Sequence, residues 1–137
     1  MLHRKVFCCM TEEIRQWLAK STDDIENAQF LFDNRWPQPF ELICFLCQQC
    51  AEKSMKAFLI HCNVEFPYTH DLRWLYKLCM KHSGAFEPFL DACQVLTPYA
   101  IDAKYPNQLE VDLPAATYAL ANAREIFNTA VAAITDE

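Results

Sequence analysis

With 137 residues, of which 53% are hydrophobic, the chain has the size of one ordinary domain that buries a core without disulfides or metals. Its single glycine, Gly84, argues against all-β and Rossmann-type folds, because their turns and phosphate-binding loops require several glycines. A formal net charge of −6 argues against broad electrostatic binding of nucleic acid, although a local basic patch stays compatible with it. Because no apolar run approaches the roughly 20 residues that span a bilayer, we expect no membrane span.

Residues 1–9 read MLHRKVFCC, a short basic and apolar leader that lacks the length of a signal peptide. We interpret them as a tail, or as an early start codon upstream of Met10. The domain is therefore expected to cover residues 10–137.

The first helix is predicted to begin at Thr11 and to run to about Phe32. The Thr11 side chain is suited to cap the free amides of a helix start, and two glutamates follow it, where acids favour the positive end of the helix dipole. Apolar residues then recur with helical period. The acidic residues in the middle of this helix are expected to face water: Asp23, Asp24 and Glu26.

A turn broken by prolines, residues 34–39, leads into the central helix, which we predict over residues 39–62. This helix is apolar over most of its circumference, so it belongs inside a bundle. At roughly 100° per residue, its polar side chains form one stripe, with Gln48 at the margin and the others in a narrow sector: Gln49, Glu52, Lys53 and Lys56. Such a stripe must find polar partners within the fold.

The chain has eight cysteines, and three of them, Cys44, Cys47 and Cys50, lie on successive turns of the central helix. Neighbours such as Cys44 and Cys47 are poor disulfide partners, which favours a reducing cytoplasm. Zinc and iron–sulfur ligands usually sit on loops that let several thiolates converge. We therefore predict that these cysteines pack in the core, and we expect no metal and no cofactor.

Three further helices are predicted in the second half. Thr69 is expected to cap a third helix over residues 70–82, ended by Ser83 and Gly84. Residues 85–104 are predicted as a fourth helix, bent near Pro98.

Asp112 is predicted to cap the fifth helix, which starts near Pro114. The order of elements predicts an all-α fold, an up-and-down antiparallel bundle of four to five helices.

Three strings occur in one order: CFLCQQCAEKSMKAFLI, then PYTHDL, then YAIDAKYP. Together they resemble the HEPN domain (higher eukaryotes and prokaryotes nucleotide-binding) over roughly residues 10–134. The resemblance implies a helical bundle that is commonly a homodimer and is often encoded beside a minimal nucleotidyltransferase in two-gene toxin–antitoxin modules. It also implies a set of nucleotide-binding residues: Gln48, Gln49, Glu52, Lys53, Lys56, Thr69, His70, Asp71, Tyr99, Asp102, Lys104 and Tyr105. The family more usually has arginine where Lys104 stands, and lysine keeps the charge but lacks the planar fork of donors.

Many HEPN proteins are metal-independent ribonucleases whose signature is an arginine followed, after four to six residues, by a histidine. The histidine can move the proton of the attacking 2′-hydroxyl while the arginine stabilises the charged phosphorane. Arg15, Arg35 and Arg124 have no histidine in that window, and Arg73 precedes His82 by too many residues. The ribonuclease signature is therefore absent.

Each of these residues also has a simpler structural interpretation. Glu52 and Lys56 have the spacing of a helix-supporting ion pair, the glutamines can bond across helices, and His70 can bind a backbone or carboxylate partner. Tyr99 and Tyr105 can be core aromatics whose hydroxyls reach the rim.

Three hypotheses follow. The first, which we favour, is a non-catalytic module that pairs with a nucleotidyltransferase and holds a nucleotide or RNA end against Lys53, Lys56 and Lys104. The second is an RNA-cleaving toxin with His70 as acid and base and Lys104 as charge stabiliser. The third is a purely structural homodimer assembled through exposed aromatics such as Trp36 and Trp74.

Overall fold

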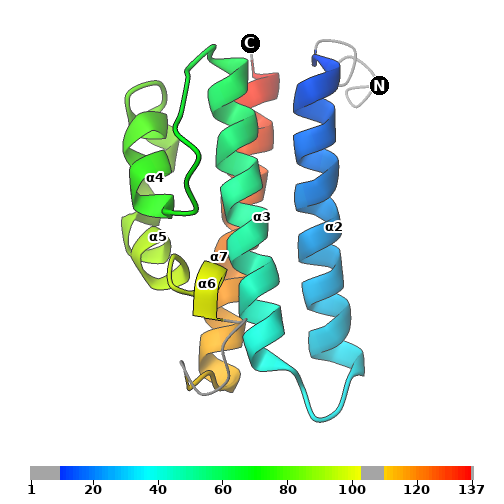
Figure 1. The fold of residues 1–137 in the computed structure, drawn as a ribbon. Coiled ribbons are helices and arrows are strands. Elements are labelled where there is room, and N and C mark those ends of the chain that lie inside the picture. The colour runs from blue at the N-terminus through cyan, green and yellow to red at the C-terminus, as the bar shows by residue number, and fades with distance from the viewer. Residues whose placement is uncertain (1–9, 103–109, 137) are drawn as a thin grey trace.

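The computed structural model describes residues 10–102 and 110–136, and within these ranges the fold is all-helical, as predicted (Figure 1). The tail predicted for residues 1–9 lies outside the described residues. The elements in chain order are α2 (Glu12–Asn34), α3 (Phe40–His61), α4 (Leu72–Met80), the 3₁₀ helix η1 (Gly84–Phe89), α5 (Leu90–Leu96), α6 (Tyr99–Asp102) and α7 (Leu113–Thr135). None of the described helices combines the length and the hydropathy that crossing a lipid bilayer requires.

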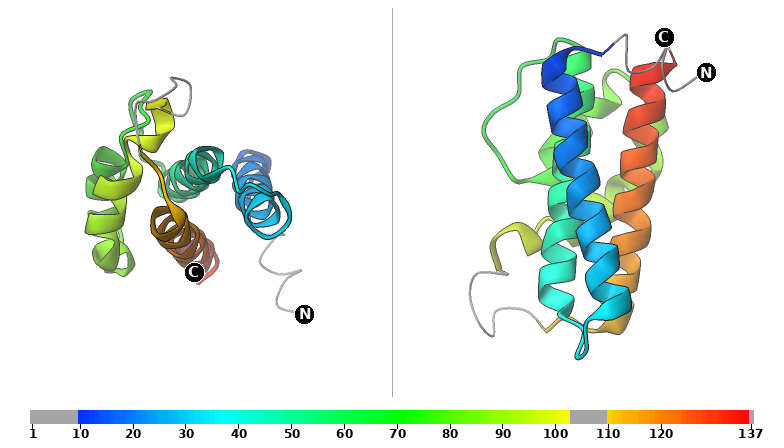
Figure 2. Two further views of the ribbon diagram at one scale, coloured as in Figure 1. Left: turned by 90° about the horizontal axis from the view of Figure 1, so that it is seen from below. Right: turned by 90° about the vertical axis from the view of Figure 1, so that its right-hand side faces the viewer.

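The central position of α3 organises the bundle. α2 packs on one side of it, α7 on another and α4 to α6 on a third, whereas α2 and α7 touch each other at few points (Figures 1 and 2). The cysteines of α3 lie in the core, as predicted: Cys44, Cys47 and Cys50 have no exposed surface. The expected caps are also present, because Thr11 Oγ1 accepts a hydrogen bond from the Ile14 amide and Asp112 Oδ1 accepts one from Ala115.

The third helix starts later and ends earlier than predicted. The N-cap of α4 is Asp71, whose Oδ1 accepts from the Arg73 amide at 2.9 Å, and the helix ends at Met80. Thr69 instead accepts from the Asp71 amide at 3.0 Å, which forms a short turn before the helix. His70 and Asp71 therefore precede the helix rather than occupying its first turn.

The predicted fourth helix is three separate pieces: η1, α5 and α6. Pro88 lies inside η1 and Pro98 separates α5 from α6, and proline cannot donate the backbone hydrogen bond of a continuing helix. Thr97 strengthens the second break, because its Oγ1 donates to the Cys93 carbonyl at 2.6 Å and accepts from the Leu72 amide at 3.1 Å. The end of the predicted helix, residues 103–104, lies outside the described residues.

The connection from α3 to α4, residues 62–71, is called the strap below. Asn63 turns the chain at the end of α3 with a left-handed φ of 58°, a conformation that asparagine tolerates better than most residues. The Val64 amide bonds back to the Leu59 carbonyl at 2.9 Å and the Asn63 amide to Ile60 at 3.0 Å, which is a Schellman motif. The strap then runs back along α3 (Figure 1) and delivers His70 to the middle of that helix.

Candidate functional site

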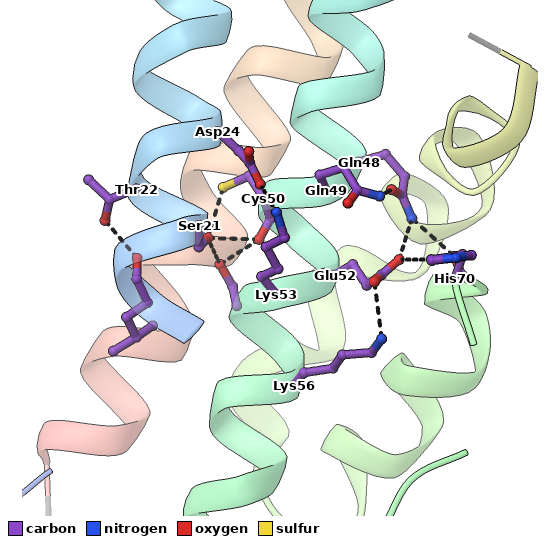
Figure 3. A network of polar contacts seen from close by, with 12 residues as sticks. Ser21, Thr22, Asp24, Gln48, Gln49, Cys50, Glu52, Lys53, Lys56 and His70 are labelled. Carbon is purple, nitrogen blue, oxygen red and sulfur yellow. Dashed lines mark hydrogen bonds and ion pairs between the residues drawn. The ribbon is translucent and has the colours of Figure 1, made fainter. Parts of the chain in front are cut away.

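A buried carboxylate at the middle of α3 is the centre of the candidate site. The Glu52 residue is 4% exposed, and three side chains meet its oxygens (Figure 3): His70 Nδ1 at 2.8 Å, Lys56 Nζ at 3.0 Å and Gln48 Nε2 at 3.2 Å. A buried charge is tolerated only when it is paired and hydrogen-bonded. Because an ionised carboxylate only accepts hydrogen bonds, the contact with His70 requires a hydrogen on Nδ1.

Two residues of α3 fix His70 at the end of the strap. Glu52 holds the ring, and Gln48 Nε2 donates to the main-chain oxygen of His70 at 3.0 Å. The His70 side chain is nevertheless 42% exposed. With Nδ1 on the carboxylate, Nε2 is the ring nitrogen left for a ligand. Tyr68, which is 90% exposed, stands edge-on to the imidazole with the ring centroids 5.5 Å apart.

Lys56 is enclosed inside the fold. Its side chain is 5% exposed, and besides Glu52 its Nζ lies 5.7 Å from the ring centroid of Trp17 and 5.8 Å from those of Phe66 and Tyr68. Aromatic faces attract a cation, and more strongly where water is excluded. The predicted ion pair between Glu52 and Lys56 is confirmed, and the strap covers it.

Lys53, also on the predicted stripe, faces α2. Lys53 Nζ lies 2.6 Å from Asp24 Oδ2, and Gln49 Nε2 donates to Gln48 Oε1 at 2.7 Å. The prediction that Asp24 faces water was wrong, because Lys53 holds it half-buried against α3. Burial raises the pKa of Asp24, and the hydrogen bond from Lys53 opposes that rise. The stripe is thus divided between two neighbours, the strap and α2.

The remaining predicted site residues are placed less centrally. Asp71 caps α4 and also binds Arg73 through two parallel contacts, Nε to Oδ1 and Nη2 to Oδ2, each 2.9 Å, and these bonds hold the pKa of Asp71 below its usual range. Tyr99, on α6, is half-buried against the core, and burial raises its pKa. The Asp102 side chain and the predicted residues Lys104 and Tyr105 lie outside what the structure describes.

The aromatic ring of Tyr68 and the two other rings around Lys56 were not among the predicted site residues. Trp17 recurs with the apolar face of its helix and was interpreted as core, and Phe66 lies in a segment that shows only a break in the helix. Trp17 comes from α2 and the other two rings come from the strap, so no local spacing reveals that Trp17 converges with them. Tyr68 alone carried a signal, since it stands two residues before His70 within the PYTHDL string.

The geometry defines what the site can do chemically. A carboxylate bonded to Nδ1 orients the imidazole, and Nε2 is then the ring nitrogen that can contact a ligand. The exposed Tyr68 ring offers a flat surface next to it. Together these groups form a partly exposed polar site on one side of α3.

Comparison with known proteins identifies one protein family that matches this chain. The family model of the HEPN domain matches residues 14–134. The chain is similar to the crystal structure of ST0689, an archaeal HEPN homologue, with 25% identity, coverage of 88% of this chain and 91% of that one, and a TM-score of 0.54.

It also shares its fold with the crystal structure of TT1696 from Thermus thermophilus, with 22% identity, coverage of 92% and 98% respectively, and a TM-score of 0.56. No curated protein matches the chain in sequence. Since the family match spans nearly the whole described bundle, this chain belongs to the HEPN domain family.

Proposed function

We propose that this chain is a nucleotide- or RNA-binding HEPN module of the cytoplasm, a homodimer that pairs with a separately encoded minimal nucleotidyltransferase in a toxin–antitoxin module. The observation that carries the binding role is the contact between buried Glu52 and half-exposed His70, beside the exposed ring of Tyr68. The partner and the dimer are inferred from the family to which the chain belongs.

In the proposed site, Tyr68 and His70 contact the ligand directly. A base stacked on an aromatic ring is worth roughly 1–3 kcal/mol by alanine substitution, and a protonated His70 can donate from Nε2 to a phosphate oxygen. Gln48, Glu52 and Lys56 support these two residues from below. By the same proposal the late motif completes the site, with Tyr99, Asp102, Lys104 and Tyr105.

The two lysines of the central helix have internal partners, and this changes the choice of test variants. Removal of Lys53 leaves Asp24 unpaired, and removal of Lys56 leaves Glu52 short of a donor. Alanine substitutions there would lower stability and ligand binding together. Tyr68 and His70 are better probes, because Tyr68 is exposed and the His70 side chain is partly exposed, and an asparagine at position 70 keeps an amide donor for Glu52.

The binding test is a thermal-shift and calorimetric titration with ATP, GTP and a short single-stranded RNA. A ligand present at about 100 times its Kd stabilises the native state by about 2.7 kcal/mol, so a clear rise in Tm is expected for the wild type. Tyr68→Ala and His70→Asn should lose that rise. Tyr118→Ala, which removes another partly exposed tyrosine on α7, is the matched control and should keep it. A wild-type protein that responds to none of the three ligands would overturn the binding role.

The partner is tested separately by co-expression with a nucleotidyltransferase encoded by the neighbouring gene. We expect the two chains to co-purify as a complex that survives gel filtration. Genes on both sides that encode no such enzyme, or two chains that elute apart, would contradict this half of the proposal without affecting the ligand titration.

A second candidate, a metal-independent ribonuclease, is favoured by one feature: Glu52 orients His70 as a general base is oriented. Nε2 would take the proton of the RNA 2′-hydroxyl as the 2′-oxygen bonds to phosphorus, and the 5′-oxygen would leave as a hydroxyl that takes the proton back from the imidazolium. The missing arginine–histidine signature counts against it. RNA cleavage in EDTA that is lost in His70→Ala would support this candidate, whereas cleavage that persists in that variant would assign it to a contaminant.

A further inference from the structure

A groove between α4 and α5 continues from the strap on the outer side of the molecule. It encloses about 430 Å³ and is lined by Asp71, Arg73, Trp74, Lys77, Leu90 and Gln94. Asp71, one of the lining residues, directly follows His70 in the chain. We call it the α4–α5 groove.

Two cations line this groove in a chain whose formal net charge is −6. Arg73 and Lys77 are four residues apart on α4 and therefore share a face of the helix. Asp71 binds Arg73 through Nε and one Nη2 hydrogen, which orients the guanidinium and leaves its other N–H groups for a ligand. Lys77 is exposed and has no ion pair within the described part of the chain. The lining thus carries two positive charges and one negative charge.

The apolar part of the groove is an aromatic ring beside an aliphatic side chain. Trp74 is 51% exposed and Leu90 is 44% exposed, so both present surface to the solvent, and the Gln94 amide stands among them. Cations that follow a backbone, with an aromatic ring on which a base can stack, are the combination by which proteins bind single-stranded nucleic acid. An amide can in addition bond to the edge of a base.

We propose that the α4–α5 groove binds the continuing strand of a single-stranded RNA whose end lies at His70, with one base on Trp74 and a phosphate between Arg73 and Lys77. This inference rests on the proposed function and extends it from a nucleotide site to a path for a strand. The exposed Trp74 ring, on which a base can stack, and the position of Asp71 next to His70 in the chain favour RNA over an acidic protein segment, which is the competing occupant.

The test compares a mononucleotide with a strand. Binding of ATP and of a labelled single-stranded RNA of about eight nucleotides is measured by calorimetry and fluorescence anisotropy, with circular dichroism to show that each variant is folded. The groove variants are Trp74→Ala and Lys77→Glu. The matched controls are Trp36→Ala, an exposed tryptophan at the turn between α2 and α3, and Lys81→Glu, one turn beyond Lys77.

We expect Trp74→Ala to weaken RNA binding about tenfold, as loss of one stacked base does, and to leave ATP binding unchanged. Lys77→Glu should weaken RNA binding and reduce its logarithmic dependence on salt by about 0.7 per lost phosphate contact. Both controls should bind like the wild type.

Three outcomes would overturn the inference. If the groove variants bind RNA as the wild type does, the groove is not part of the path, although the nucleotide site stands. If they bind RNA normally but lose binding of a poly-glutamate peptide, the occupant is an acidic protein segment. If the wild type binds neither ATP nor RNA, the proposed function fails as well, and the ATP arm of the experiment separates that result from the first.

Discussion

Glu52 Oε1 lies 2.8 Å from His70 Nδ1, and the two residues are separated by 18 positions in the chain. The carboxylate side chain is 5% exposed and the imidazole side chain is 42% exposed, so one partner belongs to the core and the other to the surface. The imidazole is therefore held in one orientation before any ligand arrives. Because the imidazole is already oriented, it loses less conformational entropy when a ligand binds.

The buried ion pair between Lys56 and Glu52 is expected to be strongly coupled. Lys56→Met leaves the carboxylate buried without its cation, and we expect a loss of about 3 kcal/mol in the free energy of unfolding, because breaking one partner of a buried pair typically costs 3–5 kcal/mol. The double variant Glu52→Gln, Lys56→Met should recover most of it. Urea denaturation of the wild type, both single variants and the double variant measures the coupling. If the loss of stability in the double variant equals the sum of the losses in the two single variants, the two residues act independently.

Asp71 should make the free energy of unfolding depend on pH in the acid range. Hydrogen bonds from Arg73 hold its pKa below the ordinary value of 3.8. A carboxyl with a lowered pKa stabilises the folded state above the unfolded pKa and loses that effect as the pH falls through the folded pKa. Asp71→Asn keeps a capping oxygen but carries no charge. The stability advantage of the wild type over Asp71→Asn should be constant above about pH 5 and should shrink below about pH 4.

Urea denaturation over a pH series, with Asp71→Ala alongside, separates the charge from the cap. Asp71→Ala removes the cap as well and is expected to cost about 1 kcal/mol at neutral pH. An advantage over Asp71→Asn that stays the same from neutral to acid pH would show that Arg73 does not perturb Asp71.

Ser21 and Ser54 form a buried polar contact between α2 and α3. Their hydroxyl oxygens lie 2.6 Å apart, and each is 2.8 Å from the Cys50 carbonyl (Figure 3). Ser21→Ala is expected to cost about 1 kcal/mol, and the Ser21→Ala, Ser54→Ala double variant should cost less than the sum, because either single change already removes the contact that the two hydroxyls share. Thr22→Ala, next in the chain but bonded only within its own helix, should change stability by less than about 0.5 kcal/mol. Thermal or chemical denaturation of the four proteins provides the comparison.

The core cysteines should react slowly with thiol reagents. Burial raises the pKa of Cys44 and of Cys93 to about 12 and that of Cys50 to about 11, and thiols react as thiolates. In a Cys8→Ser, Cys9→Ser background, six cysteines remain. Half-buried Cys62 should react with DTNB first, and the other five should wait for unfolding. Rapid reaction of several thiols without denaturant would contradict this order.

The fold was predictable wherever the signal was local. Thr11 and Asp112 were identified as caps because each lies just before an apolar periodic stretch. A bend was expected at Pro98, where the structure instead ends one helix and begins another, because proline has no amide hydrogen. The start of α4 was placed wrongly because Thr69 and Asp71 are both good caps within three residues. The residue that caps α4 is Asp71, and Arg73 in the first turn of the helix binds its carboxylate.

The candidate site was predictable only in part. The spacing of Glu52 and Lys56 predicted their ion pair, but not that the pair is buried, because burial depends on the strap returning along α3 after Asn63. The pairing of Lys53 with Asp24 was missed for the same reason: the partners lie on different helices, 29 positions apart. Helical period orders the residues around one helix and carries no information on which neighbour covers each face.

The central position of α3 has a consequence for how the domain opens. Because α2 and α7 each pack on α3 and hardly touch each other, displacement of α3 would remove the packing surface of both long helices at once. The amide hydrogens of α3 should therefore exchange with solvent only through global unfolding, whereas those of α6 can exchange through local opening. We therefore expect the domain to unfold as one cooperative unit around α3, and the slowest-exchanging amides in a hydrogen-exchange experiment should map to that helix.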